Sequence, residues 1–154
     1  MTPEQLQTLG TEVRNDPEAI GYAQYLPDSP GLVADLLNAP TRSMVKPLPS
    51  GTAKIWAAAG PYAKIVDASE NRALNIAVRA SCLVVRDEFI SAGTIHIDQP
   101  KVRAMFDAWI VAGVITADEH ADLIAEATVA ASRAEQLGLP PVTIYDLIDS
   151  GVIA

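Results

Sequence analysis

The stretch ASRAEQLGLPPVTIYDLIDSG, residues 131–151, indicates how the end of the chain folds. Gly138 can adopt the left-handed conformation that ends a helix, and the prolines at 140 and 141 prevent the helix from continuing. Thr143 then offers a hydroxyl that can cap a new helix, with Asp146 as the second half of a capping box. The pattern predicts a helix ending at Gly138, an extended link and a short closing helix.

The closing helix is amphipathic, but it is shorter than the roughly 12 residues at which an isolated helix becomes marginally stable in water. It must therefore dock, either on the rest of this domain or on a neighbouring chain. The helix before Gly138 is expected to begin at Thr116, because Thr116 and Glu119 form a complete capping box. Its narrow, alanine-rich seam would let backbones approach closely; the seam consists of Leu123, Ala127, Ala130, Ala134 and Leu137.

Similar signals mark the other helix starts. Thr2 and Gln5 can form a capping box around Pro3, and Asp16-Pro17 and Ser29-Pro30 place a capping residue before a proline. The segment from about residue 70 to 91 is apolar around most of its circumference, which predicts a central helix surrounded by protein. Helices are expected over about 3–14, 30–38, 51–68 with a bend at Gly60-Pro61, 70–91 and 100–112, and a short turn of helix is expected at 17–25.

An extended arm is expected where three prolines occur close together. The prolines at 40, 47 and 49 prevent a helix, and residues 42–46 alternate in character as an edge strand does. The run TIHID, residues 94–98, also alternates. The two runs could pair as a two-stranded ribbon, or either could pair with another chain.

These patterns predict a mainly α protein: a compact multi-helix domain with a proline-bounded extended arm and at most a short two-stranded β ribbon. Its 154 residues fall within the usual size of one domain. We expect a single domain over 1–154, with N-terminal helices over 1–39, the arm over 40–50, a helical core over 51–139 and the docking helix over 140–154.

The charge and composition exclude several classes of function. The net charge is −8, and no stripe of Lys and Arg is present to bind phosphates, which argues against direct contact with nucleic acid. No segment approaches the roughly 20 apolar residues of a membrane helix, and the N-terminus lacks the pattern of a secretory signal. A soluble intracellular product without membrane contact is expected.

Candidate catalytic and metal-binding residues are few. His96 and His120 are the only histidines, and Glu119, His120 and Asp122 are read as a solvated helix start. Cys82 lies in an apolar run and is expected to be a small buried hydrophobe. The sequence also has no nucleophile turn around Ser132 and no phosphate-binding loop. We therefore predict no enzyme, no cofactor, no metal and no small-molecule substrate; a hydrolase or metal protein using Glu119 and His120 is the weaker alternative.

Several short motifs, taken in their order and spacing, resemble a group of small proteins encoded among the structural genes of tailed bacteriophages. The motifs are MTPEQL, Asp16-Pro17 followed by Gly21-Tyr22, Leu36-Leu37-Asn38, Ile55-Trp56, and SRAEQLG at 132–138 before a closing helix led by Val and Thr. The resemblance implies a role in the virion or its assembly, near the tail or the head–tail junction, and brings no catalytic residues with it.

The expected function is therefore that of a non-enzymatic structural protein in the virion, present in symmetric copies. Its partners would be other phage structural proteins and copies of itself, contacted through residues 40–49 and 142–154. The residues predicted to make protein contacts are Met44, Val45, Trp56, Tyr145, Leu147 and Ile148. The alternative is an assembly factor of the tail-chaperone type, which is absent from the mature virion.

Overall fold

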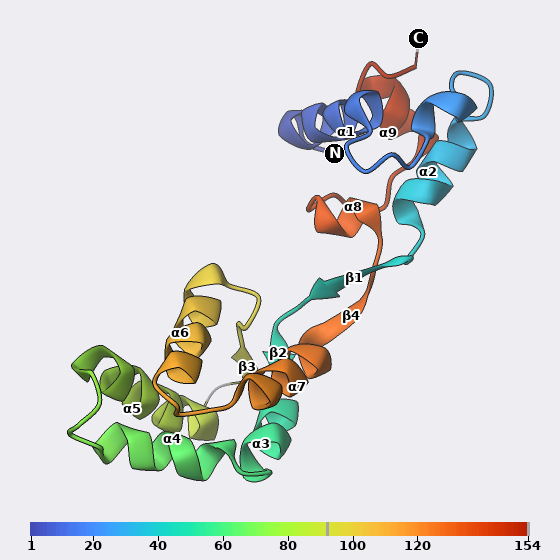
Figure 1. Ribbon diagram of the computed structural model, residues 1–154. Helices are drawn as coiled ribbons and strands as arrows, with labels where there is room; N and C mark the ends of the chain where they lie inside the picture. Colours follow the sequence, from blue (N-terminus) through green and yellow to red (C-terminus); the bar gives the residue numbers. More distant parts are fainter. Residues whose placement is uncertain (92, 154) are drawn as a thin grey trace. The chain divides into compact units, whose positions relative to one another are not determined.

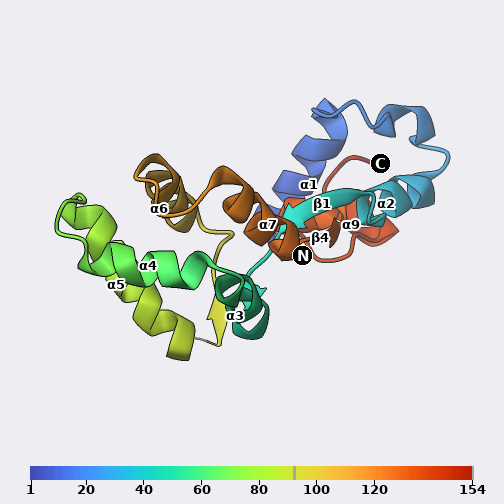
Figure 2. The same ribbon diagram turned by 60° about the horizontal axis from the view of Figure 1, so that its bottom comes forward.

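The computed structural model describes residues 1–91 and 93–153, with the side chains of 1–87 and 93–153. Helices make up 61% of the chain, and the strands form two small two-stranded sheets. The prediction of a mainly α protein is confirmed. Figures 1 and 2 show, in two views, helices throughout the chain with short strands between some of them.

The chain divides into two compact units. Unit 1 combines residues 1–44 with residues 130–154, and unit 2 consists of residues 45–129. The chain passes from one unit to the other at β1 (Arg42–Val45) and at β4 (Thr128–Ala131), which form one of the two sheets. A single domain stays a prediction, because compactness does not measure whether the two units unfold together.

Unit 1 is built from helices at both ends of the sequence. They are α1 (Pro3–Asn15), the 3-10 helix η1 (Tyr22–Tyr25), α2 (Pro30–Asn38), α8 (Arg133–Gln136) and α9 (Ile144–Asp149). Each of these helices, and the link before α9, contributes buried apolar side chains to one cluster. The cluster includes Leu9, Val13, Tyr22, Val33, Leu37, Ala134, Leu139, Val142 and Leu147. Residues more than 100 positions apart in the sequence therefore share one core.

The predicted capping boxes of unit 1 are present. The Thr2 hydroxyl accepts a hydrogen bond from the Gln5 N–H at 3.2 Å, and the Gln5 side chain accepts one from the Thr2 N–H at 3.0 Å. Thr143 and Asp146 make the same pair of bonds at the start of α9. Each box satisfies backbone donors that the first helical turn leaves without a partner.

The short turn of helix predicted over 17–25 forms only in its second half. Asp16 is in the left-handed conformation at the end of α1, and its carboxylate accepts hydrogen bonds from the N–H groups of Ile20 and Gly21 at 2.7 and 2.6 Å. These bonds hold residues 17–21 in a turn, and only Tyr22–Tyr25 form helix, of the 3-10 kind. Asp16 acts as a turn residue here because its side chain competes with a helix for the backbone N–H groups.

The closing helix α9 docks within its own unit, on α1 and α2 (Figure 1). Leu147 is fully buried among the side chains of unit 1. The Asn38 side chain also bonds to both the N–H and the carbonyl of Val142, each at 2.8 Å, and so fixes the extended link before α9. The sequence left open whether this helix docks on its own domain or on a neighbouring chain. In the structure, Leu147 packs into the core of its own unit.

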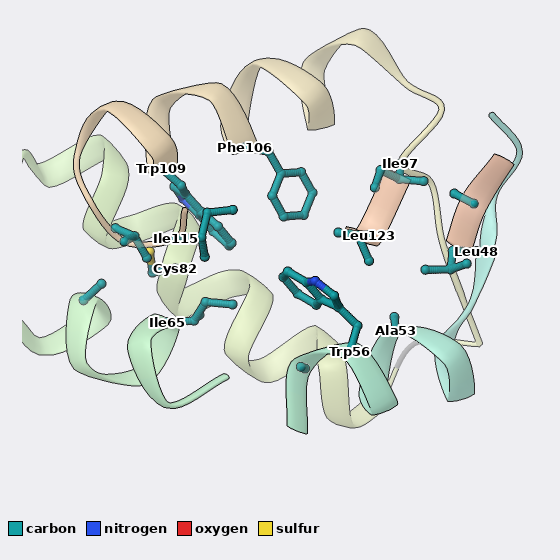
Figure 3. Close-up of a cluster of buried hydrophobic side chains, with 14 residues drawn as sticks. Leu48, Ala53, Trp56, Ile65, Cys82, Ile97, Phe106, Trp109, Ile115 and Leu123 are labelled. Carbon is teal, nitrogen blue, oxygen red and sulfur yellow. The ribbon is translucent and has the colours of Figure 1, made fainter. Parts of the chain in front are cut away.

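Unit 2 contains the remaining elements. They are β2 (Leu48–Pro49), α3 (Ser50–Ala58), α4 (Pro61–Glu70), α5 (Ile76–Ser91), β3 (Thr94–Ile95), α6 (Pro100–Val111) and α7 (Ala117–Ala127). Figure 3 shows Phe106 pointing from α6 into the core toward Trp56 of α3. Phe106 makes edge contacts with Trp56 and Trp109, at ring-centre distances of 6.4 and 5.2 Å.

Two helix predictions in unit 2 need correction. The bent helix over 51–68 is two helices, α3 and α4, because Gly60 takes a φ of 143° that ends the first and Pro61 begins the second. The expected surrounded helix is α5, and it is not surrounded over its described side chains. Cys82 is buried as predicted, but Ile76 and Val84 are 73% and 60% exposed. Phe89, another apolar residue of this predicted helix, lies outside the described side chains.

The predicted pairing of 42–46 with 94–98 is wrong, because each run pairs with a different segment. β3 pairs antiparallel with β2, with Leu48 opposite Ile95 and Pro49 opposite Thr94. Pro47 has no N–H to donate to a ladder and separates β1 from β2, so the two halves of the arm pair with different segments. β1 is the neighbour of β4.

The predicted continuous helix from Thr116 to Gly138 is interrupted. Its start at the Thr116–Glu119 capping box and its left-handed end at Gly138 are confirmed. Between them, α7 ends at Ala127, the strand β4 follows, and α8 begins after Ser132. Ser132 and Glu135 form a capping box of their own, with bonds of 3.1 and 2.9 Å. A serine that caps a helix start cannot lie inside a helix, which is why α8 is separate.

Candidate interaction surfaces

The residues predicted to contact other chains lie in different environments. Trp56 and Leu147 are buried in the cores of units 2 and 1, and the Trp56 indole N–H donates to the Glu119 carbonyl at 2.7 Å. Neither side chain is therefore presented to another chain in this structure. Met44 and Val45 are half-buried. Tyr145 and Ile148 are 79% and 47% exposed.

Tyr145 and Ile148 belong to a larger apolar surface of unit 1. Ile144 and Leu32 are also exposed, and the Ile144 side chain lies beside Gly31, the residue before Leu32: a Cβ added to Gly31 would be 3.8 Å from Ile144 Cδ1. We call this surface the α2–α9 face and define it by Leu32, Ile144, Tyr145 and Ile148. The three residues from α9 fall within about 100° of the helix circumference, so they form one side of that helix.

A groove adjoins the α2–α9 face. It has a volume of about 240 Å³ and is lined by Tyr25, Leu32, Asp35, Leu36 and Ala39. Leu32, Asp35 and Leu36 lie at helical spacing on α2, Ala39 follows the end of that helix, and Tyr25 belongs to η1. Leu32 therefore belongs both to the groove and to the face, and apolar surface continues from one to the other.

Acidic side chains accompany this surface. Asp35 lines the groove, Asp28 precedes α2 and Asp149 follows Ile148, and all three are exposed. Unit 1 as a whole has nine acidic side chains against three arginines and no lysine, for a net charge of −6. Unit 2 has ten acidic against eight basic side chains, for a net charge of −2. Most of the protein's negative charge therefore belongs to unit 1.

Two of the three arginines of unit 1 are used inside the unit. Arg133 forms a bidentate pair with Glu12, with both N–O distances 2.8 Å, and its Nη1 donates to Glu18 at 2.5 Å. Arg42 pairs with the other oxygen of Glu18. The side chains of Glu12 and Arg133 are only 4% and 13% exposed. This network ties α1 to α8 and leaves Arg14 as the arginine outside it.

The network also explains two pKa shifts. Hydrogen bonds to Glu12 raise the pKa of Arg133, because they stabilise the charged guanidinium. Burial raises the pKa of Tyr22, and the Glu12 carboxylate raises it further, since the phenol donates to that carboxylate at 3.4 Å. Both groups therefore keep their protons under physiological conditions, and the network is structural.

Unit 2 has an apolar surface of its own, on α5. We call Ile76, Leu83 and Val84, all exposed, the α5 face. Val84 also lines an apolar cavity of about 270 Å³, together with Ile95, Val102, Met105, Phe106 and Leu123. Figure 3 shows Phe106 and Leu123 near Trp56 in the core of unit 2.

The residues of the weaker catalytic alternative have structural partners. Glu119 caps α7 and pairs with Lys64 at 2.7 Å, and this bond to Lys64 and those to Thr116 lower its pKa. His120 stacks on Phe106 with ring centres 5.3 Å apart. Within the described chain, no group of three or more His, Cys, Asp or Glu residues could hold a metal ion. Among the described helices, none combines the length and the hydropathy of a membrane-spanning segment.

Comparisons with protein families, curated proteins and solved structures gave no match. The functional argument therefore starts from the surfaces themselves.

Sequence reasoning found half of the α2–α9 face and missed the rest. It selected Tyr145 and Ile148 from the amphipathic closing helix, but it did not select Ile144 or Leu32. The available signal was the spacing of Ile144 and Ile148, which are one helical turn apart. Leu32 gave no comparable signal, because the contact between α2 and α9 joins segments that are over 100 residues apart.

Proposed function

We propose that this protein is a non-enzymatic structural protein of a tailed bacteriophage particle, placed near the tail or the head–tail junction and assembled in symmetric copies. The α2–α9 face is the observation that carries the proposal. Adjacent exposed apolar side chains, beside a groove and accompanied by polar residues, are typical of surfaces that bind other proteins. The resemblance of the sequence motifs to proteins from phage structural genes supplies the setting.

The construction of α9 supports a role in binding. Leu147 anchors this six-residue helix in the core of its own unit, and the Thr143–Asp146 capping box holds its first turn, so the outward side chains are held in place before any partner arrives. Tyr145 is large and amphipathic and has few rotatable bonds, and such side chains lose little conformational entropy on binding. A preorganised surface of this kind is suited to repeated, identical contacts in an assembly.

An assembly factor of the tail-chaperone type is the second candidate. The net charge of −6 on unit 1 favours it, because an acidic surface can shield a basic client until assembly. Such a factor would be needed during morphogenesis and missing from the finished particle.

Mass spectrometry of purified virions separates the two candidates, using a phage that carries this gene. The structural role predicts the protein in virions at a fixed copy number relative to a known tail protein. The assembly role predicts that particles form only when the gene is present, but that the protein is absent from purified virions. If the gene can be deleted without reducing the yield of particles, both proposals are wrong.

Paired variants test the face itself. Tyr145→Ser/Ile148→Ser should fold normally and lose incorporation into virions, because both side chains are exposed and absent from the core. The matched control is Ile55→Ser/Val111→Ser, which removes two exposed apolar side chains from unit 2. Equal incorporation of the two double variants would contradict the assignment of this face.

A further inference from the structure

We infer that the α2–α9 face binds a basic amphipathic helix from a different protein. The inference rests on the proposed function in taking this face as a protein contact, and it adds the chemistry of the partner. Two observations carry it: the helical arrangement of the exposed apolar residues, and the imbalance of charge in unit 1.

The shape of the face favours a helix as the bound element. Leu32 and Leu36 on α2, and Ile144 and Ile148 on α9, are two pairs of apolar residues spaced by one helical turn. Side chains in such pairs form ridges, and a third helix packs its own ridges into the space between them. The groove of about 240 Å³ between α2 and Tyr25 is large enough for one bulky apolar side chain of that helix.

The charges around the face favour a basic partner. Asp35 lines the groove, Asp28 precedes α2 and Asp149 follows Ile148; all three are exposed, and unit 1 has no lysine with which to balance them. Arg42 and Arg133 are already paired with glutamates. A helix with Lys or Arg flanking its apolar stripe would meet carboxylates on this surface, whereas an acidic helix would be repelled.

The same charges argue against a second copy of the chain as the occupant. Two α2–α9 faces brought together would join two units that each have a net charge of −6. Like charges across an interface oppose association, and the cost is largest at low salt. Symmetric copies of the protein would therefore contact one another through other surfaces.

Designed peptides test the partner's chemistry directly. The probe is a fluorescently labelled 14-residue peptide of leucine and lysine, with leucine at helical spacing. A second peptide has glutamate in place of every lysine. A third has the composition of the first, but with leucine and lysine alternating as in a strand. Fluorescence anisotropy with the full-length protein measures binding at low salt and at increasing salt concentration.

The helical lysine peptide should bind, and its affinity should fall as salt is added. Asp35→Asn/Asp149→Asn should weaken this binding by roughly 2- to 30-fold, since each exposed charge pair contributes modestly. Tyr145→Ser/Ile148→Ser should weaken it further. Asp87→Asn/Asp107→Asn is the matched control, because it removes two exposed negative charges from unit 2; it should change the affinity by less than about 2-fold.

Several outcomes would overturn the inference. If the glutamate peptide binds as tightly as the helical lysine peptide, the partner need not be basic. If the alternating peptide binds as tightly, the partner need not be a helix. Equal weakening by the two paired aspartate variants would mean that the peptide binds negative charge in general. Self-association that is abolished by Tyr145→Ser/Ile148→Ser, measured by light scattering, would identify a second copy as the occupant.

The inference and the proposed function fail separately. If the protein is found in virions but binds none of the peptides, the proposed function is supported and the inference is wrong. If the protein binds the helical lysine peptide through this face but is dispensable for making particles, the inference is supported and the proposed function is wrong.

Discussion

Replacing Arg133 with methionine should destabilise unit 1 by about 3–5 kcal/mol, the usual cost of removing one partner from a buried ion pair. The change leaves the Glu12 carboxylate, which is 4% exposed, without its two 2.8 Å hydrogen bonds from the guanidinium. Only the long hydrogen bond from Tyr22 would remain. Glu18 is less affected, because it keeps its pair with Arg42.

The positions of the tryptophans make the experiment informative. Both Trp56 and Trp109 lie in unit 2, so their fluorescence reports on that unit, whereas far-UV circular dichroism reports on helices in both. If the chain melts as one unit, both signals should shift together, by roughly 6–20 °C for this loss of stability. If unit 1 melts alone, circular dichroism should show an earlier transition that the fluorescence does not follow.

Two further variants test the reasoning. Glu12→Leu/Arg133→Met removes both charges, and it should be more stable than Arg133→Met because no uncompensated charge stays buried. Arg86→Met is the control, since Arg86 pairs with the exposed Glu70 and Asp87 of unit 2 and should lose at most about 1 kcal/mol. A loss for Arg133→Met no larger than that of Arg86→Met would refute the importance of the buried pair.

Three other predictions follow from individual side chains. Ser81→Ala should cost about 1–3 kcal/mol in denaturant unfolding, because the buried Trp109 indole N–H loses its acceptor at 2.8 Å; an unchanged midpoint would contradict this. Burial alone would raise the pKa of Asp146, but bonds from the Thr143 hydroxyl and N–H and the Met1 ammonium lower it overall. The stability that the ionised Asp146 contributes is therefore present above about pH 4 and lost as the pH falls through the lowered pKa. The difference in free energy of unfolding between the wild type and Asp146→Asn should consequently become smaller in acid. Burial raises the pKa of the Cys82 thiol to about 11, so a thiol reagent at pH 8 should label it only after unfolding; rapid labelling of the native protein would show that this part of unit 2 opens.

Local signals in the sequence predicted local structure well. The capping boxes at Thr2, Thr116 and Thr143 form as expected, and Gly138 takes the left-handed conformation that ends α8. These features depend on residues three or four positions apart, which the sequence shows directly. The box at Ser132 is equally visible in the sequence, but the alanines around it also fit a longer helix, so the two signals conflict there.

Features that depend on distant residues could not be predicted. Nothing near β1 in the sequence indicates that its neighbour is β4 and not the run beginning at Thr94. The exposed side of α5 has the same apolar residue types as its buried side, so composition could not tell them apart. For the α2–α9 face, the amphipathic pattern of α9 predicted Tyr145 and Ile148, whereas the contact between α9 and α2 is visible only in the structure.

The discontinuity of unit 1 has a consequence for how the protein is made on the ribosome. Residues 1–44 emerge first, but they share their core with residues 130–154, and the 85 residues of unit 2 must be translated in between. At typical rates of synthesis, that interval is about 4–17 s. During it, Leu9, Val13 and Leu37 have no access to Leu147. The nascent N-terminal segment is thus a natural client for a chaperone, whereas all of the residues that form the core of unit 2 lie in one continuous stretch of sequence.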